Sequence, residues 1–403
     1  MRIAYVCADA GVPIFGRKGC SVHVQEMVRA LQRRGASVDL FAARVDDRPP
    51  PGLESLRVYR MPAVGDGEPP SHTAAMAALN RELAAALDGA GPYDLVYERY
   101  SLWSFAGMEH ARAAGTPGLL EVNAPLIEEQ AVHRGLRDAA GAETVAARVF
   151  RAAAALLAVS AEVAAWLERS AAVGGRVHVI ANGVDPDRFH PDVPPATPGP
   201  PGTFTVGFVG SMKRWHGLPV LIEAFARLQT RVAASRLLLV GAGPEDAAVR
   251  AALTDRGLAL ASCLTGAVAP GEVPAFLTSM DAAIAPYPES RGFYFSPLKV
   301  YEYMAAGRAV VASGVGQVAA VIRHDVNGLL CPPGDSVALA AALERLQREP
   351  ELGARLGRAA RVWTLQRHTW EAVADRVLEV ADTARRAGRR DGRREQPRAR
   401  VEA

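Results

Sequence analysis

Short apolar runs recur along the first half of the chain, and each is separated from the next by a longer amphipathic or polar stretch. Strands are expected at Arg2–Cys7, Ser37–Ala42, Leu56–Arg60, Leu95–Tyr97, Gly118–Val122, Ala152–Ala158 and Arg176–Ile180. Short apolar runs that alternate with helical patterns are typical of a parallel sheet covered by helices on both faces. The pattern therefore predicts an α/β domain, with a helix over Ser21–Arg33 among its connections.

A proline-rich stretch interrupts this pattern and divides the chain. The prolines at 191, 194, 195, 198, 200 and 201 favour neither a helix nor a central strand, so a linker is predicted over 187–203. Further strands are expected at Phe204–Gly210, Arg236–Val240, Ala282–Ala285 and Ala309–Ala312. We predict Rossmann-like domains over 1–186 and 204–368, a helix crossing back to the first domain over 369–384, and a disordered basic tail over 385–403.

Length and composition agree with two domains of this class. The chain has 403 residues, of which 49% are hydrophobic, and this is enough for two cores of about 200 residues each. The four cysteines show no CxxC spacing, so they are expected to be reduced thiols of a cytoplasmic protein. The first residues are typical of a strand and not of a signal peptide, and no apolar run reaches the roughly 20 residues of a membrane span.

The net charge of +3 is concentrated at the C-terminus. From Arg385 onwards the chain carries eight arginines and three acidic residues, so this segment holds +5 and the remainder −2. One interpretation is a solvated tail, and the other is weak attraction to an anionic membrane surface. Nucleic-acid binding is not expected, because no aromatic residues are interleaved with these arginines.

The segment from Ser296 to Gly307 carries the clearest chemistry. Ser296, Pro297, Leu298 and Lys299 lead into a predicted short helix that contains Glu302 and lies between two strands. In parallel sheets, ligands bind at the carboxyl ends of strands and anions bind at helix N-termini. Glu302 can accept hydrogen bonds from a sugar diol, and Lys299 can face a phosphate. A nucleotide-sugar site is therefore predicted; the alternative is an ordinary amphipathic helix with Glu302 in solvent.

This segment resembles the donor-site signature of family 4 retaining glycosyltransferases, which have the GT-B fold of two facing Rossmann-like domains with a cleft between them. Glu302 matches the second Glu of that signature, which binds the nucleotide ribose in the family. Tyr294 stands where the first Glu, which approaches the donor sugar, would fall. The Ser-Pro-Leu-Lys form is similar to a sub-branch of the family, so the resemblance implies a variant donor site that includes Ser296, Pro297 and Leu298.

One glycine-rich loop of the first domain and two turns of the second support the resemblance in part. The loop with Gly11, Gly16 and Gly19 fits neither a dinucleotide fingerprint nor a Walker motif. It resembles the family's glycine-rich first loop, with Gly19 near the donor diphosphate and Ser21 as the helix cap. In the second domain, the family's base-binding turns correspond to the segments with Gly241, Gly243, Gly266 and Val268.

The diphosphate-binding pair of the family is replaced in this chain. The family often has an Arg and a Lys in the loop after the first strand of the second domain, where this sequence has Ser211 and His216. Lys213 and Lys299 are predicted to supply the missing charge, and the amide groups of Ser211 and Ser296 to assist. For Lys213, an exposed loop lysine is an equally good interpretation.

The acceptor side is less distinctive. Asn123 occupies the position where family enzymes often place a His near the donor sugar, and it can hydrogen-bond a hydroxyl without titrating. An acidic acceptor mouth is expected from Glu98, Glu121, Glu128 and Glu129, although helix-start glutamates explain the last two better. The only Asp-x-Asp spacing, at Asp185, fits a turn better than a metal site.

We expect a metal-independent bacterial glycosyltransferase that uses a nucleotide-sugar co-substrate and no cofactor, and that transfers with retention to an acceptor hydroxyl. The resemblance favours a UDP-sugar, with UDP-N-acetylglucosamine as the first example, in a glycan or natural-product pathway such as aminoglycoside formation. The alternatives are a GT-B-fold epimerase or phosphorylase, or a non-catalytic nucleotide-sugar-binding subunit. The sequence does not define the oligomeric state.

Overall fold

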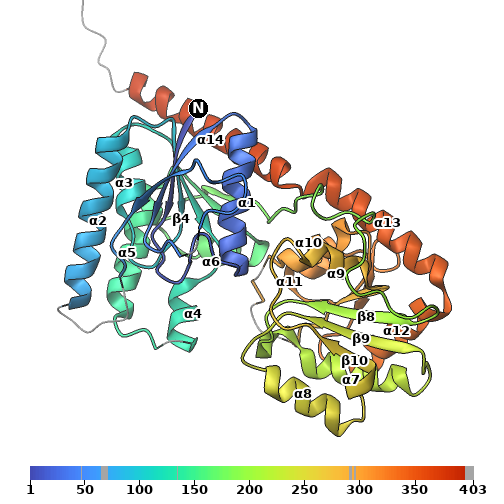
Figure 1. Ribbon diagram of the computed structural model, residues 1–403. Coiled ribbons are helices and arrows are strands. Elements are labelled where there is room, and N and C mark those ends of the chain that lie inside the picture. The colour runs from blue at the N-terminus through green and yellow to red at the C-terminus, as the bar shows by residue number, and fades with distance from the viewer. Residues whose placement is uncertain (47, 65–70, 134, 290–292, 295, 395–403) are drawn as a thin grey trace, which may run out of the picture. The chain divides into compact units, whose positions relative to one another are not determined.

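The computed structural model describes residues 1–46, 48–64, 71–133, 135–289, 293–294 and 296–394 (Figure 1). By its contacts the chain forms two compact units. Unit 1 comprises Met1–Ala181 and the segment from Trp370 onwards, and unit 2 comprises Asn182–Thr369. Each unit is built around one parallel sheet, so the prediction of two Rossmann-like domains is confirmed.

The sheet of unit 1 has seven parallel strands in the order β3-β2-β1-β4-β5-β6-β7. The strands are β1 Arg2–Cys7, β2 Ser37–Ala42, β3 Arg57–Arg60, β4 Leu95–Arg99, β5 Gly118–Val122, β6 Ala155–Ala158 and β7 Val177–Val179. The helices are α1 Gly19–Arg33, α2 Ser71–Ala90, α3 Ala106–Ala113, α4 Leu126–His133, α5 Ala139–Ala152, α6 Ala161–Glu168 and α14 Trp370–Arg394. The strand order changes direction between β1 and β4, which is where ligands bind in doubly wound sheets.

The sheet of unit 2 has six parallel strands in the order β10-β9-β8-β11-β12-β13. The strands are β8 Phe204–Val209, β9 Ser235–Val240, β10 Ser262–Leu264, β11 Ala282–Ala285, β12 Ala309–Ser313 and β13 Leu329–Cys331. The α-helices are α7 Leu218–Gln229, α8 Asp246–Asp255, α9 Val273–Thr278, α10 Leu298–Ala305, α11 Gly316–Val321, α12 Ser336–Arg348 and α13 Pro350–Arg367, with 3₁₀ turns η1 Arg214–His216 and η2 Ala259–Ala261. Its switch point lies between β8 and β11.

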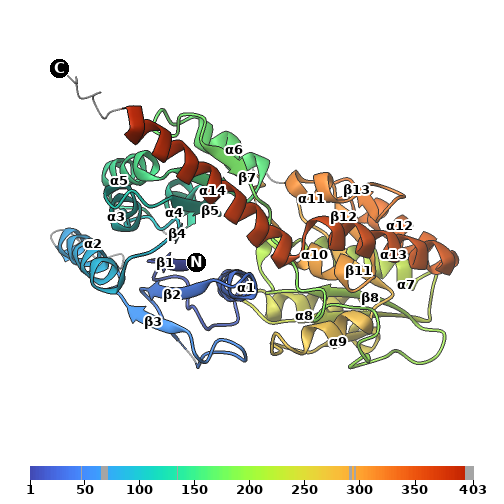
Figure 2. The same cartoon turned by 90° about the horizontal axis from the view of Figure 1, so that it is seen from above.

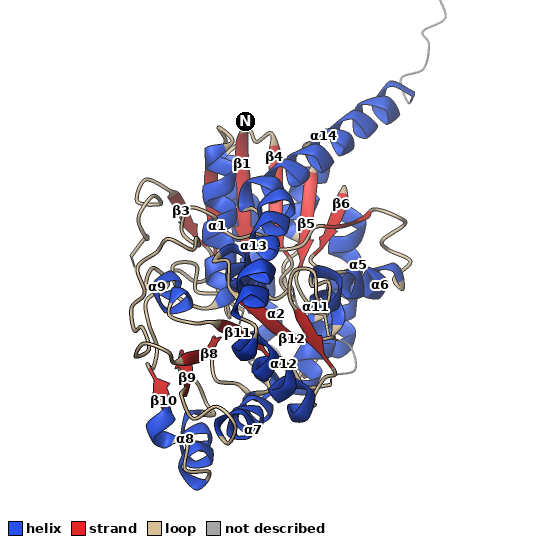
Figure 3. Cartoon of the chain, turned by 90° about the vertical axis from the view of Figure 1, so that its right-hand side faces the viewer, coloured by secondary structure: helices blue, strands red, loops and turns tan. Residues whose placement is uncertain are grey.

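Helices cover both faces of each sheet. In unit 1, α2, α3 and α5 stack on one face, while α1 packs against α14 on the other (Figure 2). In unit 2, α7 packs with α12 on one side of the strands (Figures 1 and 3), and α10 packs with α13 on the other (Figure 1). Strands buried on both faces explain why the sequence shows near-continuous apolar runs and little alternation. Within the described part of the chain, no helix combines the length and apolar character needed to cross a bilayer.

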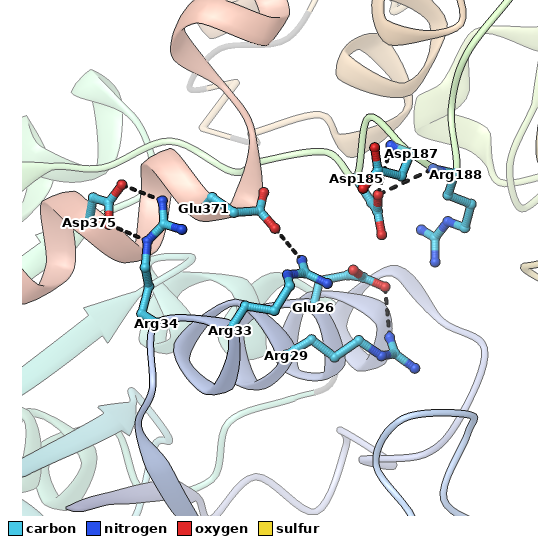
Figure 4. Close-up of polar contacts among 9 residues, drawn as sticks. All are labelled: Glu26, Arg29, Arg33, Arg34, Asp185, Asp187, Arg188, Glu371 and Asp375. Carbon is cyan, nitrogen blue, oxygen red and sulfur yellow. Dashed lines mark hydrogen bonds and ion pairs between the residues drawn. The ribbon is translucent and has the colours of Figure 1, made fainter. Parts of the chain in front are cut away.

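The C-terminal helix belongs to unit 1 through paired charges. Arg33 of α1 contacts Glu371 of α14 at 2.6 Å, and Arg34 donates to Asp375 at 2.6 Å (Figure 4). The helix continues to Arg394, so the disorder predicted from Arg385 is wrong for residues 385–394. Arginine is a good helix former, and Arg385 also donates to the carbonyl of Asp94 at 3.0 Å. Residues 395–403 of the predicted tail lie outside the described residues.

Other boundaries also differ from the sequence prediction. The units divide after Ala181 and after Thr369, and the proline-rich segment 187–203 belongs to unit 2. This segment has no regular structure, but it is fixed to its own unit: the Ala196 amide donates to the Ala275 carbonyl at 2.8 Å. The strand predicted from Ala152 begins at Ala155, because the alanine-rich end of α5 extends to Ala152.

Candidate active site

Helix α10 is fastened to the end of β8 by one buried tyrosine. The Val209 amide donates to the hydroxyl of Tyr303 at 2.8 Å, and this hydroxyl donates back to the Val209 carbonyl at 3.2 Å. Tyr303 lies one turn after Lys299, so the anchor brings Lys299 to the carboxyl end of β8, at the switch point of the unit 2 sheet. Sequence reasoning missed Tyr303, because its role depends on a contact with a distant strand.

Lys299 carries a buried charge without a hydrogen-bond partner. Its Nζ atom is buried, although the residue as a whole is only half-buried, and no described residue accepts a hydrogen bond from it. The ammonium lies 4.1 Å from the centre of the Phe208 ring and 5.7 Å from that of Tyr287. Burial lowers the pKa of Lys299 to about 7, and the nearby Glu302 offsets this only in part. Contacts with aromatic rings compensate for the lost hydration of the ammonium less than an anion would. The site is therefore suited to binding an anion.

Glu302 and the residues before Lys299 share the same short helix. Lys299 and Glu302 are three positions apart on α10, so they lie on one helical face. Pro297 is the N-cap residue and Leu298 the first helical residue. Ser296 is held by Asn182: the Asn182 amide donates to the Ser296 hydroxyl at 3.2 Å, and its side chain donates to the Ser296 carbonyl at 2.9 Å.

The loop after β8 places Ser211, Lys213 and His216 near one another. The Nδ1 atom of His216 contacts the Ser211 carbonyl, and the Lys213 ammonium lies 4.7 Å from the centre of the Trp215 ring. Burial, together with the nearby Lys299, lowers the pKa of His216 to about 3. His216 is therefore neutral near pH 7 and supplies no positive charge. Of these basic groups, Lys299 and Lys213 remain as the cations that can face a diphosphate.

The predicted base-binding turns lie beside the same loop. The Met212 amide donates to the Ala242 carbonyl at 3.3 Å, and the Gly241 amide donates to the Gly266 carbonyl at 3.0 Å. A Cβ atom at Gly243 would lie 2.5 Å from the Met212 carbonyl oxygen, so this close packing needs a glycine. Val268 follows in the half-buried loop after Gly266. The two turns therefore lie directly after β9 and β10, at the ends of these strands.

A buried glutamine fixes the glycine-rich loop of unit 1 through two hydrogen bonds to its backbone. Gln25 donates to the carbonyl of Ile14 at 2.8 Å and to that of Gly16 at 3.0 Å. Gly19 is exposed and is the first residue of α1. The prediction of Ser21 as the helix cap is wrong, because α1 begins two residues earlier and Ser21 is buried in its first turn.

Asn123 follows β5 at the carboxyl edge of the unit 1 sheet and donates to the carboxylate of Glu121. The predicted acidic mouth is not formed by all four glutamates. Glu98 and Glu121 are 0% and 3% exposed, whereas the exposed Glu128 accepts a hydrogen bond from Trp166 at 2.6 Å. Strand residues of a sheet covered on both faces point into the interior, which explains why Glu98 and Glu121 do not reach the surface.

Glu98 instead forms a buried contact with α3. It accepts a hydrogen bond from Ser104 at 2.6 Å, and a Cβ atom at Gly107 would lie only 2.4 Å from its second oxygen. Burial raises the pKa of Glu98 to about 7, against the opposing hydrogen bonds from Ser104 and the Met108 amide. The folded protein therefore retains a proton here that the unfolded chain loses near pH 4.5.

Replacing Glu98 by glutamine should stabilise the protein in a pH-dependent manner. A raised carboxyl pKa contributes stability below about pH 4.5, and this contribution is lost as the pH rises through about 7. The Glu98→Gln variant stays neutral, so its advantage over the wild type should be small at pH 5 and reach about 3 kcal/mol at pH 8.5. Unfolding at both pH values measures this. A stability difference between the variant and the wild type that does not change with pH would contradict the raised pKa of Glu98.

No metal site emerges from the described residues. Among them, no group of three or more His, Cys, Asp or Glu side chains is arranged to hold an ion. Asp185, in the only Asp-x-Asp spacing, closes a turn by accepting hydrogen bonds from the amides of Asp187 at 3.0 Å and Arg188 at 3.2 Å (Figure 4). This agrees with the turn interpretation of the motif.

Two family models match the chain, one mainly in unit 1 and the other in unit 2. Residues 17–188 match the model described as Glycosyltransferase Family 4, and residues 203–349 match the model described as Glycosyl transferases group 1. A D-inositol 3-phosphate glycosyltransferase from Xylanimonas cellulosilytica is 29% identical over 90% of this chain and 91% of its own. A 2-deoxystreptamine glucosyltransferase from Streptomyces kanamyceticus is 29% identical over 68% of this chain and 73% of its own.

Solved structures share the fold over nearly the whole length. Sucrose-phosphate synthase from Thermosynechococcus elongatus superposes with a TM-score of 0.72 at 21% identity, over 96% of this chain and 99% of that one. Anabaena HepE in complex with UDP-glucose gives a TM-score of 0.70 at 20% identity, over 95% and 100%. Together these findings support a family 4-like glycosyltransferase of the GT-B fold. The chain is thus a glycosyltransferase, with bacterial relatives.

Proposed function

We propose that the protein transfers a sugar from a UDP-activated donor to an acceptor hydroxyl, with retention of anomeric configuration and without a metal ion. The observation that carries the proposal is the buried, unpartnered ammonium of Lys299 at the unit 2 switch point. A nucleoside diphosphate supplies the missing counter-charge. Its ribose hydroxyls can bind Glu302, on the same face of α10.

The same groups provide the catalytic effect. As the bond between the sugar and the diphosphate breaks, negative charge accumulates on the phosphate oxygens. Lys299, assisted by Lys213 and by backbone amides of the Ser211 loop, stabilises this leaving group, and a preorganised charge costs little reorganisation. The acceptor hydroxyl attacks from the face that the diphosphate leaves, and a phosphate oxygen takes its proton. No protein base is required, in keeping with an asparagine at position 123.

Uracil and a hexose are the preferred parts of the donor. The support is the family likeness, together with the UDP and UDP-glucose bound by the structurally similar HepE. Backbone groups at Gly241, Gly243, Gly266 and Val268 are proposed to hold the base. UDP-glucose and UDP-N-acetylglucosamine are therefore the first donors to examine.

The names of the relatives favour a cyclitol acceptor. Inositol phosphate and 2-deoxystreptamine are both six-membered carbon rings with several hydroxyl groups. We propose an acceptor of this class, within a bacterial glycan or natural-product pathway. The described cysteines are free thiols, which suits the reducing cytoplasm, and the basic segment from Arg385 would add weak attraction to an anionic membrane surface.

A donor and acceptor screen tests this function. Nucleotide sugars are first ranked by the rise in melting temperature, because a ligand of the folded state stabilises it. The stabilising donors are then incubated with inositol phosphate and 2-deoxystreptamine in excess chelator, and the anomer of the product is read by NMR. Retained configuration without metal is expected. An inverted product, or activity lost with the chelator, would refute the mechanism, and UDP binding without transfer to any acceptor would favour the non-catalytic subunit.

A further inference from the structure

The side-chain amide of Asn123, at the carboxyl end of β5, has a fixed orientation. Its Nδ2 atom donates to Oε1 of Glu121, two residues earlier in the chain. The amide oxygen of Asn123 makes no hydrogen bond with any described residue, and the side chain is half-buried. The amide atom that remains available to a ligand is therefore the side-chain oxygen of Asn123, which is a hydrogen-bond acceptor.

Several residues contact the Glu121 carboxylate and fix its position. The Asn123 amide, which donates to this carboxylate, is therefore not free to turn. Tyr97 donates to Oε2, and Arg99 donates to Oε1 at 3.1 Å. Nε2 of His23 lies 2.8 Å from Oε1 without making a hydrogen bond. Glu121 is 3% exposed. These contacts come from β4 and α1, which meet β5 at the carboxyl edge of the sheet.

The protonation state of Glu121 determines which way the Asn123 amide faces. Burial alone would raise the pKa of Glu121, but His23, Arg99 and Tyr97 outweigh it and lower the pKa to about 2. An ionised carboxylate has no proton to donate and can only accept. A neighbouring amide must then direct its NH₂ group at Glu121, which turns the carbonyl oxygen of Asn123 outward.

We infer that Glu121 is a positioning residue: it fixes the Asn123 amide so that position 123 accepts a hydrogen bond from a sugar or acceptor hydroxyl. This inference rests on the proposed function and deepens it, because it states what the asparagine does in place of the family's histidine. The carbonyl oxygen selects a hydroxyl donor, and it repels a phosphate or carboxylate oxygen at the same point.

A purely structural role for Glu121 would depend on a different property of the side chain than the positioning role does. The buried charge of Arg99 needs the negative charge of Glu121, whereas Asn123 needs only an acceptor oxygen at the correct position. Glu121→Asp keeps the charge but withdraws the oxygen by one methylene. Glu121→Gln loses the charge but keeps an oxygen in place, because its NH₂ group can face the Tyr97 hydroxyl. The two substitutions therefore separate the two roles.

The experiment measures release of UDP from UDP-glucose, with water as acceptor, alongside UDP affinity and melting temperature. Glu121→Asp should lower kcat about tenfold with UDP affinity unchanged within about twofold, because UDP lacks the sugar. Glu121→Gln should melt at a lower temperature than Glu121→Asp and yet retain kcat within about threefold. Tyr97→Phe, which removes a donor from the opposite oxygen, is the matched control and should also keep kcat within about threefold.

A double-mutant cycle with Asn123→Ala completes the test, with Glu121→Ala as a second partner if the aspartate variant does not fold. If Glu121 acts through Asn123, the double variant is no slower than Asn123→Ala alone. Losses that multiply to about a hundredfold, or a glutamine variant slower than the aspartate variant, would overturn the inference while the enzyme remains active. A wild type that neither binds UDP nor turns over any UDP-sugar overturns the proposed function, and this inference with it.

Discussion

Replacing Lys299 by methionine is expected to lower kcat/KM for sugar transfer by about 100- to 1,000-fold, because the loss of one preorganised charge at a developing anion has effects of this size. Methionine has a similar length and can occupy the space beside the Phe208 and Tyr287 rings. The same substitution should raise the stability of the free protein. The depressed pKa of Lys299, about 7, shows that folding disfavours the charged form, so stability is lost as the pH falls from about 10.5 through about 7.

The Lys299→Met substitution should therefore raise stability while it lowers the rate of sugar transfer. At pH 7, Lys299→Met should be more stable than the wild type by on the order of 3 kcal/mol, measured by urea unfolding, while transfer nearly stops. Lys213→Met is the comparison variant: the half-buried Lys213, beside the Trp215 ring, only assists Lys299, so its loss should change transfer by less than about tenfold. A Lys299→Met enzyme within about tenfold of wild-type activity would refute the role of Lys299.

Gly217→Ala is expected to destabilise unit 2 by about 4 kcal/mol or more. Gly217 has φ +70°, and a Cβ atom there would lie 1.7 Å from the carbonyl oxygen of Pro286. The left-handed backbone alone costs an alanine about 1–2 kcal/mol, and the clash adds to this because a backbone carbonyl cannot easily move aside. Pro286 precedes Tyr287, so the shift should also disturb the ring that contacts Lys299 and weaken UDP binding.

Gly257 provides a closely matched control. Its φ is +69°, and an added Cβ atom would meet nothing within 4 Å. Gly257→Ala should therefore cost only the backbone strain, about 1–2 kcal/mol, and leave UDP affinity unchanged. Chemical unfolding of both variants, with UDP titrations, measures the difference. Equal losses of stability would show that the close approach to Pro286 does not constrain position 217.

Local pattern was enough to predict the two sheets and the short helix that carries the proposed donor-site residues. The apolar runs located strands such as β5 and β11 because buried parallel strands have a continuous signature. Lys299 and Glu302 could be placed on one face of a helix from their spacing alone. The short strand β13, Leu329–Cys331, was not predicted, because three residues carry too little periodicity.

The remainder depends on contacts between distant parts of the chain. Tyr303 is one more polar residue in an amphipathic helix until β8 supplies its partner, Val209. Glu121 was expected at an acidic mouth, but its burial and its four partners become visible only when β4, β5 and α1 come together. The neutral state of His216 likewise follows from burial beside Lys299, which sequence position does not reveal.

The central claim is that Lys299 receives the donor diphosphate, and calorimetric titration of UDP at pH 8 tests it most directly. Near this pH Lys299 is mostly neutral, with a pKa of about 7, whereas phosphate groups with a pKa near 6 are already ionised. Binding the diphosphate should therefore draw about one proton into the complex, seen as a dependence of the observed heat on buffer ionisation enthalpy. The account predicts this uptake for the wild type and its loss in Lys299→Met. Binding without proton uptake, or equal uptake by both proteins, would contradict it.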